Sequence, residues 1–297
     1  MGYRTAAQMA DVWGVSARSV RNYCAQGRVP GAFLSGKTWN IPEDAPKPVR
    51  ATAQLAESPL LRRLREEVEA GLSGGIYHKV QVELAYNSNR IEGSRLSHDQ
   101  TRQIFETATI EAEGGVVKVD DIVGAANHFR CFDYVLQTAQ QPLSAAMLKR
   151  LHELLKRGTS DAARDWFSVG DWKRLPNEVG GRETTPPEAV GSAIEELLTA
   201  YCPQRVHTFD EIVDFHVRFE RIHPFQDGNG RVGRLVMFKE CLASGIVPFV
   251  LTDDAKPFYY RGLAEWDEER GYLRDTCLAA QDQFKAWLDY FRIPYEG

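Results

Sequence analysis

Beyond residue 59, apolar residues recur at intervals of three and four positions along most of the chain, which is the spacing of amphipathic α-helices. This pattern predicts helices over residues 60–72, 80–91, 122–136, 147–155, 190–201, 212–222, 235–242 and 273–291. Residues 170–187 lack the pattern and carry paired glycines and paired prolines, so we expect an exposed loop or a short hairpin there. The predicted fold class is mainly α, a helical bundle with one short β-hairpin.

A proline-rich stretch divides the chain. Residues 42–59 contain four prolines interleaved with alanine and charged residues, which interrupt helical and strand patterns and predict a linker. We therefore expect a small N-terminal domain, a linker, a group of N-terminal helices and a main domain, over residues 1–45, 46–59, 60–115 and 116–297.

Composition excludes several classes of protein. Of the 297 residues, 43% are hydrophobic and 26% charged, which are the values of an ordinary globular protein. No stretch is long and apolar enough to span a membrane, the first twelve residues lack the apolar core of a signal peptide, and the five cysteines show no CxxC spacing. We therefore expect a cytoplasmic protein with no membrane partner and no disulfide framework.

Charge is distributed unevenly along the chain. The net charge is −5, but the first 50 residues hold seven basic and three acidic side chains, so they carry +4 and the remainder carries −9. In this basic part, residues 5–12 predict a short helix, Gly14 a tight turn, and Ser16 the N-cap of a second helix. The second helix places Arg18 and Arg21 on one face, which suits phosphates and base edges.

A hairpin is expected next, around Gly36, with Lys37 near its tip. Together, residues 6–31 and 37–42 resemble the winged helix-turn-helix of the excisionase and MerR type, which implies DNA binding through Arg18, Arg21 and Lys37. Because one recognition helix buries little surface, useful affinity implies a homodimer that contacts two half-sites. Helix-turn-helix folds also serve as protein-docking or dimerisation modules, and this alternative stays open.

The densest cluster of reactive residue types lies at residues 222–235. A helix that ends at the Pro224 break and a new helix that begins near Arg231 make residues 228–230, Gly-Asn-Gly, the loop entering a helix N-terminus. Glycine permits close backbone approach, and the helix dipole favours negative charge. This loop therefore predicts a phosphate cradle.

Neighbouring side chains extend this chemistry. Arg231 and Arg234 lie three residues apart on one face behind the loop and can reach further phosphate oxygens. Asp227 offers oxygen ligands suited to Mg²⁺, which commonly bridges a carboxylate and substrate phosphates. His223 can take a proton from an attacking hydroxyl, because histidine has an intrinsic pKa of about 6.5.

The string satisfies every position of HxFx(D/E)GNGRxxR, and from about residue 60 onward the chain resembles Fic-domain proteins. The resemblance implies transfer of AMP from ATP to a hydroxyl of a protein target, with release of pyrophosphate. It implies that His223 is the general base, that Asp227 holds Mg²⁺ and that Phe225 is a core anchor. The implied contacts to the ATP phosphates are Gly228, Asn229, Gly230, Arg231 and Arg234. Relatives with altered motifs act as kinases or use other nucleotides, so the unaltered GNGR favours adenylylation.

The Fic family also places a flap hairpin over the active site, where it pairs with an extended stretch of the target. On that basis, the expected docking edge within residues 170–187 is Asn177, Glu178 and Val179. The alternative is a plain connecting loop.

A second motif lies upstream. Ser88, Glu92 and Gly93 fit (S/T)xxxE(G/N), which resembles the inhibitory motif of Fic proteins, and Ser88 and Glu92 share a helix face. The resemblance implies that Glu92 pairs with Arg234 and obstructs the γ-phosphate. Alone, such a pair is usually a solvated face, but the presence of both motifs favours inhibition. The sequence leaves open whether Glu92 only inhibits or also supports removal of AMP from the target.

Two other functions stay open on the sequence. One is a transcriptional regulator that uses the Fic body as an ATP sensor or a dimerisation scaffold. The other is kinase-like transfer of the γ-phosphoryl group.

Overall fold

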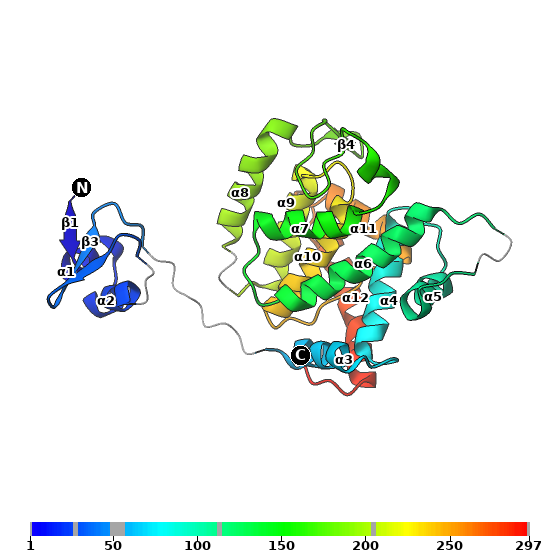
Figure 1. Cartoon of the computed structure of the whole chain (residues 1–297), viewed down its shortest axis with the longest axis horizontal. Helices are drawn as coiled ribbons and strands as arrows, with labels where there is room; N and C mark the ends of the chain where they lie inside the picture. The colour runs from blue at the N-terminus through cyan, green and yellow to red at the C-terminus, as the bar shows by residue number, and fades with distance from the viewer. Residues whose placement is uncertain (1, 26–28, 48–56, 112–114, 203–205, 296–297) are drawn as a thin grey trace. The chain divides into compact units, whose positions relative to one another are not determined.

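Figure 1 shows the computed structural model of the chain, which describes residues 2–25, 29–47, 57–111, 115–202 and 206–295. The chain divides into two compact units, Met1–Thr52 and Ala53–Gly297. Most of the linker expected over residues 46–59 lies outside the described residues, at 48–56.

The first unit packs two helices against a small sheet. Its elements are β1 (Tyr3–Thr5), α1 (Ala6–Trp13), α2 (Ala17–Ala25), β2 (Phe33–Ser35) and β3 (Thr38–Pro42). The sheet is antiparallel with the order β1-β3-β2. A capping box of Thr5 and Gln8 begins α1, and Gly14 ends it with a φ of 63°. Met9 and Val20 are fully buried and fix the two helices on each other.

The second unit is mainly helical. Its α-helices are α3 (Pro59–Ala70), α4 (Ile76–Ile91), α5 (His98–Thr107), α6 (Val119–Thr138), α7 (Ala145–Lys156), α8 (Val190–Tyr201), α9 (Phe209–Ile222), α10 (Asn229–Ala243), α11 (Lys256–Ala264) and α12 (Gly271–Tyr290). The shorter elements are the antiparallel hairpin of β4 (Glu178–Val179) and β5 (Arg182–Glu183) and the 3-10 turns η1 (Ser160–Ala163), η2 (Pro187–Ala189) and η3 (Asp253–Ala255). Each helix predicted from the periodicity is present. Within the described ranges, no helix combines the length and apolarity needed to cross a bilayer.

The periodicity did not predict α5 and α11. In α5, Ile104 is the one buried apolar residue, and the helix begins at a capping box of Ser97 and Gln100. In α11, nine residues long, the buried residues are Tyr259 and Gly262. Neither helix therefore has the repeated apolar stripe that a sequence pattern can detect.

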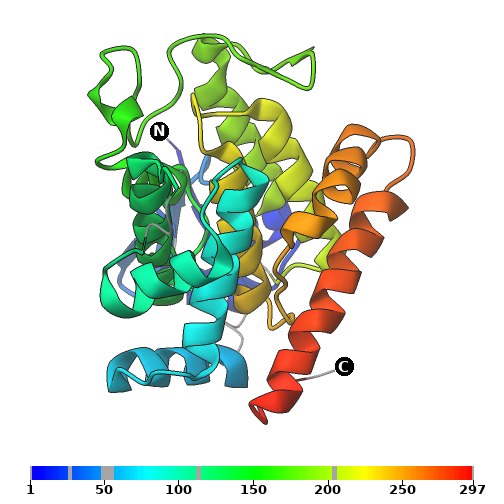
Figure 2. The same cartoon turned by 90° about the vertical axis from the view of Figure 1, so that its right-hand side faces the viewer.

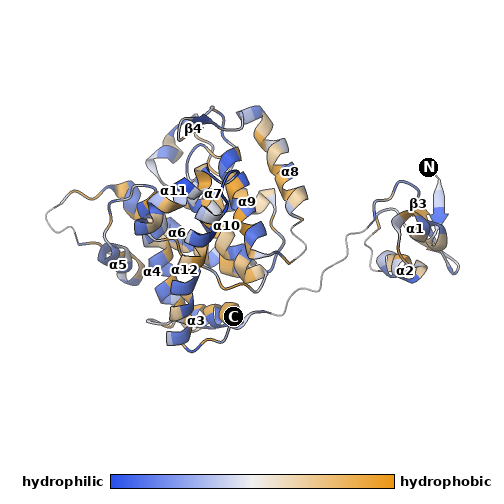
Figure 3. Cartoon of the chain, turned by 180° about the vertical axis from the view of Figure 1, so that it is seen from behind, coloured by the Kyte–Doolittle hydropathy of each residue, from blue (hydrophilic) through white to orange (hydrophobic). Residues whose placement is uncertain are grey.

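The central helix of the second unit is α10, which packs against α4, α6, α7 and α9 (Figures 1 and 2). Hydrophobic positions gather around α9 and α10 in Figure 3. Twelve of the fifteen residues of α10 are buried, including Arg234, Lys239 and Glu240. Such enclosed charges need partners, and Lys239 Nζ lies 2.7 Å from Glu240 Oε1. Arg234 lies in the N-terminal half of α10 and belongs to the motif at residues 222–235, so this half of the helix carries part of the candidate site.

Candidate active site

The loop between α9 and α10 carries the motif. Helix α9 ends at Ile222, and its C-cap His223 has a φ of 50° and donates its backbone N–H to Phe219 O. Helix α10 begins at Asn229, two residues before the expected start near Arg231, with Gly228 as its N-cap. Asn229 and Gly230 therefore form the first helical turn instead of the loop before it.

Two side chains fix the shape of this loop. Asn229 Oδ1 accepts a hydrogen bond from Phe225 N, and Asn229 Nδ2 donates to Phe225 O, both at 2.8 Å. Phe225 is fully buried and stacks on His152 with ring centroids 4.1 Å apart. The side chain of Asn229 therefore holds the loop closed. Its backbone N–H takes no part in these two hydrogen bonds and lies at the N-terminus of α10.

A Cβ would be crowded at two glycines of the motif, Gly228 before α10 and Gly230 in its first turn. Gly228 has a φ of 89°, and a Cβ there would lie 3.2 Å from Leu155 Cδ2. At Gly230, a Cβ would collide with Glu92 Oε1. The Glu92 carboxylate thus lies against the N-terminal turn of α10, where the helix dipole favours an anion.

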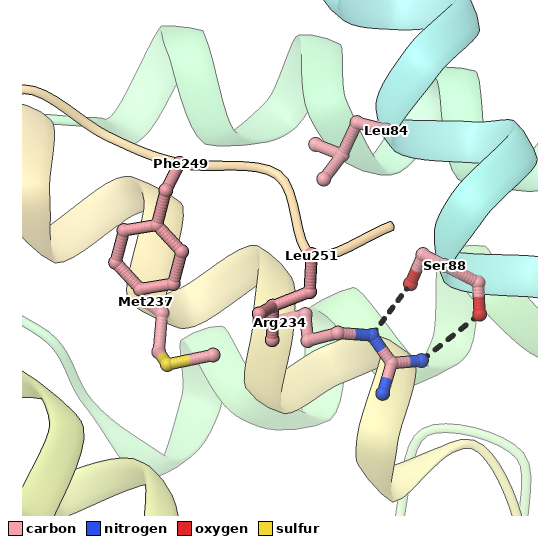
Figure 4. A pocket seen from close by; sticks show the side chains of 6 residues that line it. All are labelled: Leu84, Ser88, Arg234, Met237, Phe249 and Leu251. Atoms are coloured by element: carbon pink, nitrogen blue, oxygen red, sulfur yellow. Dashed lines mark hydrogen bonds between the residues drawn. The ribbon is translucent and has the colours of Figure 1, made fainter. Parts of the chain in front are cut away.

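Arg234 binds Ser88 and Glu92 directly. Its Nε donates to Ser88 Oγ at 3.0 Å and its Nη2 to Ser88 O at 2.9 Å, as Figure 4 shows. Nη2 also donates to Glu92 Oε1 at 2.7 Å. Gly93 follows with a φ of 94°, which turns the chain away after α4. The structure therefore brings Ser88, Glu92 and Arg234 together.

Two guanidinium donors at this site have no hydrogen-bond partner among the described residues. They are Arg231 Nε and Arg234 Nη1, and both atoms are buried. Buried donors without acceptors are costly, so an acceptor group is expected here.

His223 is held in one tautomer. Its Nδ1 lies 3.3 Å from Glu220 O, and a carbonyl can only accept, so Nδ1 carries the proton and Nε2 is left as the basic nitrogen. Burial lowers the pKa of His223 below its ordinary value. The imidazole is therefore neutral at pH 7, as a general base must be.

Glu220 lies behind the histidine, with Oε2 3.9 Å from His223 Nδ1. Burial, and then the neighbouring charge of Glu92, raises the pKa of Glu220 to about 8. At neutral pH this side chain is mostly protonated, so the acidic partner of Arg234 is Glu92.

Asp227 has cations on one side. Its Oδ2 lies 2.9 Å from Arg231 Nη2 and 2.6 Å from Lys156 Nζ. Burial acts to raise its pKa, but the charges of Arg231 and Lys156 outweigh it and hold the pKa at about 2. The carboxylate is therefore ionised at neutral pH, and its side chain is 47% exposed.

This donor set fits Mg²⁺ bound together with phosphates. Among the described residues, no group of three His, Cys, Asp or Glu side chains could hold a metal by itself. Mg²⁺ commonly takes one or two carboxylates and completes its coordination with substrate phosphates and water. Asp227, ionised and half exposed beside the helix N-terminus, meets that requirement.

The hairpin β4–β5 is fastened to the motif by Lys173. Lys173 Nζ donates to Asn177 Oδ1 at 2.7 Å and contacts Thr184 Oγ1, while Lys173 N donates to Pro224 O at 2.8 Å. Asn177 Nδ2 also donates to Phe225 O. The side chain of Asn177 therefore points inward and fixes the hairpin, whereas β4, Glu178–Val179, is exposed.

The DNA-binding candidates lie in the first unit. Arg18 and Arg21 are exposed on α2, and Lys37 is exposed in the turn between β2 and β3. Ser16 Oγ accepts from Ser19 N at 3.1 Å, so the expected N-cap of α2 is present.

Sequence reasoning did not single out Lys156, Glu220 or His152. His152 Nδ1 accepts from Gly170 N at 3.0 Å, and its Nε2 lies 3.2 Å from Asp227 O. These residues belong to ordinary helical patterns, so no local signal marked them.

Most of the second unit is similar to known proteins. Residues 142–241 match the sequence model of the Fic/DOC family. Protein adenylyltransferase Fic of Nematostella vectensis is 24% identical over 208 residues, which cover 68% of this chain and 48% of that protein. Protein adenylyltransferase Fic of Culex quinquefasciatus is 28% identical over 213 residues, covering 71% and 41%. The chain thus spans less than half the length of these curated relatives.

Solved structures show the same fold. A Fic domain containing signaling protein from Bacteroides thetaiotaomicron has a TM-score of 0.57 at 24% identity, covering 77% of this chain and 90% of that one. Fic-1 from Caenorhabditis elegans has a TM-score of 0.61 at 17% identity, covering 78% and 71%. The second unit therefore has a mainly helical Fic fold. Residues 142–241 thus match the Fic/DOC family, and the chain is similar to proteins named protein adenylyltransferase Fic.

Proposed function

We propose that this chain transfers AMP from ATP to a hydroxyl side chain of a protein target. The observation that carries the proposal is the pair of buried, unpartnered donors, Arg231 Nε and Arg234 Nη1, at the helix N-terminus beside a neutral His223. A triphosphate supplies the acceptors, and the histidine supplies the base.

The proposed reaction is an in-line displacement at the α-phosphorus. His223 Nε2 accepts the proton of the target hydroxyl while its oxygen forms a bond to the α-phosphorus, and the bond to the bridging oxygen breaks to release pyrophosphate. Arg231, Arg234 and the backbone N–H groups of residues 228–230 would bind the phosphates. Mg²⁺, when bound with the nucleotide, neutralises phosphate charge, and Asp227 would hold it.

We further propose that the chain is inhibited in cis by Glu92. Its carboxylate is bound to Arg234 at 2.7 Å and lies against Gly230, so it uses the positive charge that a γ-phosphate would use. A bound triphosphate would have to displace it or bind unproductively.

The first unit supports a second proposal, a DNA-binding winged helix-turn-helix. The supporting observation is that α1, a turn and α2 are followed by the β2–β3 hairpin, with Arg18, Arg21 and Lys37 all exposed. A gel-shift assay of the whole chain and of its Arg18→Ala, Arg21→Ala variant tests it. Equal binding by both proteins would contradict the proposal.

Labelled ATP tests the main proposal. The Glu92→Gly variant should become labelled from ATP that carries the label on the α-phosphate and not from ATP labelled on the γ-phosphate. The reverse result would indicate phosphoryl transfer, and His223→Ala in the same background should remove the label.

A further inference from the structure

Lys156, the last residue of α7, is enclosed by two carboxylates and a ring. Its Nζ lies 2.6 Å from Asp227 Oδ2 and 2.8 Å from Asp161 Oδ2, and 5.1 Å from the centre of the Phe167 ring. The lysine side chain is only 4% exposed. A buried ammonium needs such partners, so Lys156 is held firmly at the carboxylate assigned to the metal.

The partners of Lys156 are themselves fixed by the fold. Asp161 belongs to the turn η1, and Ser160 N donates to Asp120 Oδ1 on α6 at 2.9 Å, which ties this turn to the helical core. Thr159 Oγ1 donates to Lys156 O at 2.8 Å and closes the end of α7. The ammonium and Asp161 are therefore parts of one built feature and not a chance surface contact.

The two oxygens of Asp227 differ. Oδ2 accepts from both Lys156 and Arg231, whereas no described side chain forms a hydrogen bond with Oδ1. A divalent cation that binds Asp227 therefore does so next to an ammonium that already uses the same carboxylate.

We propose that Lys156 is a positioning residue that competes with the divalent cation for Asp227, and that Asp161 sets the strength of this competition by holding the ammonium. The inference rests on the proposed function, because it assigns Asp227 to the metal. On this inference, the affinity for the divalent cation depends on the C-terminal end of α7 as well as on the motif at residues 222–235.

The two neighbours of Asp227 should act with opposite signs. Lys156→Met removes a positive charge next to the cation, so divalent affinity should rise by about five- to twentyfold. Asp161→Asn removes a negative charge and leaves the ammonium to Asp227 alone, so affinity should fall by about threefold or more. If Lys156 only oriented the carboxylate, Lys156→Met would lower the affinity instead.

Binding of Mn²⁺, followed by electron paramagnetic resonance, provides the test without a turnover. The full chain carrying Glu92→Gly is titrated with Mn²⁺ in the presence of the α,β-methylene analogue of ATP, alone and with each substitution. Lys156→Arg keeps the charge and should stay within about twofold of the parent. Lys149→Met, on the same helix but paired with Asp171, is the matched control and should not change the affinity.

Tighter Mn²⁺ binding by Lys156→Met together with weaker binding by Asp161→Asn supports the inference. Unchanged or weaker Mn²⁺ binding by Lys156→Met overturns the inference. Unchanged Mn²⁺ binding by Asp161→Asn also overturns it, so the test remains possible even if Lys156→Met fails to fold. If the Glu92→Gly parent is not labelled by α-labelled ATP, the proposed function is refuted, independently of the Mn²⁺ result. Absence of Mn²⁺ binding in every variant would overturn the inference even if labelling persists.

Discussion

Arg234 and Glu92 lie 142 residues apart in the chain and form an ion pair of 2.7 Å at the N-terminal end of α10. The Arg234 side chain is 4% exposed, so its charge is compensated by this carboxylate and by Ser88 and not by bulk water. Glu92 caps α4, which lies outside the region that matches the Fic/DOC family, residues 142–241. The contact therefore joins a flanking helix to the centre of the candidate site.

Neutralising Glu92 should activate the chain. Glu92→Gln keeps the size of the side chain but removes the charge that binds Arg234, so transfer from α-labelled ATP should rise by at least about tenfold, which corresponds to about 1.4 kcal/mol. Glu196→Gln, at an exposed position of α8, should leave the rate unchanged. Equal rates for wild type and Glu92→Gln would contradict inhibition by the ion pair.

The pH profile of the activated chain should report His223. The base acts when neutral, so activity is lost as the pH falls through the pKa of His223, which burial holds below its ordinary value. The rate of AMP transfer by Glu92→Gly should therefore stay at its maximum as the pH is lowered to about 6.5, the ordinary histidine pKa, and should fall only at lower pH. Initial rates measured with α-labelled ATP across this range check it, and an acid limb centred above that value would be inconsistent with the account.

Glu220 should make stability depend on pH. Its pKa is raised to about 8 in the folded chain, so the folded state holds a proton that the unfolded state releases at lower pH. The stability linked to this proton is fully present below the ordinary glutamate pKa and is lost as the pH rises to about 8. The melting temperature of Glu220→Gln minus that of the wild type should therefore increase as the pH is raised from about 5 to about 8. A constant difference would argue against a protonated Glu220.

Lys173 should hold the hairpin in place. Lys173→Met removes the donor that joins Asn177 and Thr184, so amide hydrogen exchange over residues 175–184 should become faster, while exchange in α12 stays the same. Lys173→Arg keeps the charge and should restore part of the protection. Unchanged exchange in the hairpin after Lys173→Met would show that other contacts suffice.

The helices of the second unit could largely be predicted from the sequence, because most of them bury one apolar stripe that recurs at helical spacing. Helix α5 could not, since a capping box and contacts with α4 and α6 stabilise it with Ile104 as its one buried apolar residue. The sequence predicts too late a start for α10, because the glycine at position 230 suggests a loop, whereas in the structure that glycine leaves room for the Glu92 carboxylate.

Residue spacing alone predicts the candidate site only where its residues are neighbours in sequence, and the pairing of Glu92 with Arg234, 142 residues apart, was expected only from the resemblance to Fic proteins. His223, Asp227 and the arginines fall within one motif, so their joint presence is visible in the chain. Lys156 and Lys173 reach the same site from α7 and from the segment before the hairpin, and their roles depend on tertiary contacts with Asp227 and Pro224. A lysine is usually exposed in a helix or a loop alike, so no sequence signal marks one that is buried.

The measurement that tests the central claim most directly is intact-mass spectrometry after incubation with Mg²⁺ and ATP. The account predicts one or more added adenylyl masses on the Glu92→Gly chain, much less on the wild type, and none on the Glu92→Gly, His223→Ala chain. An adduct of the mass of a phosphoryl group, or an adenylyl adduct that persists without His223, would contradict it.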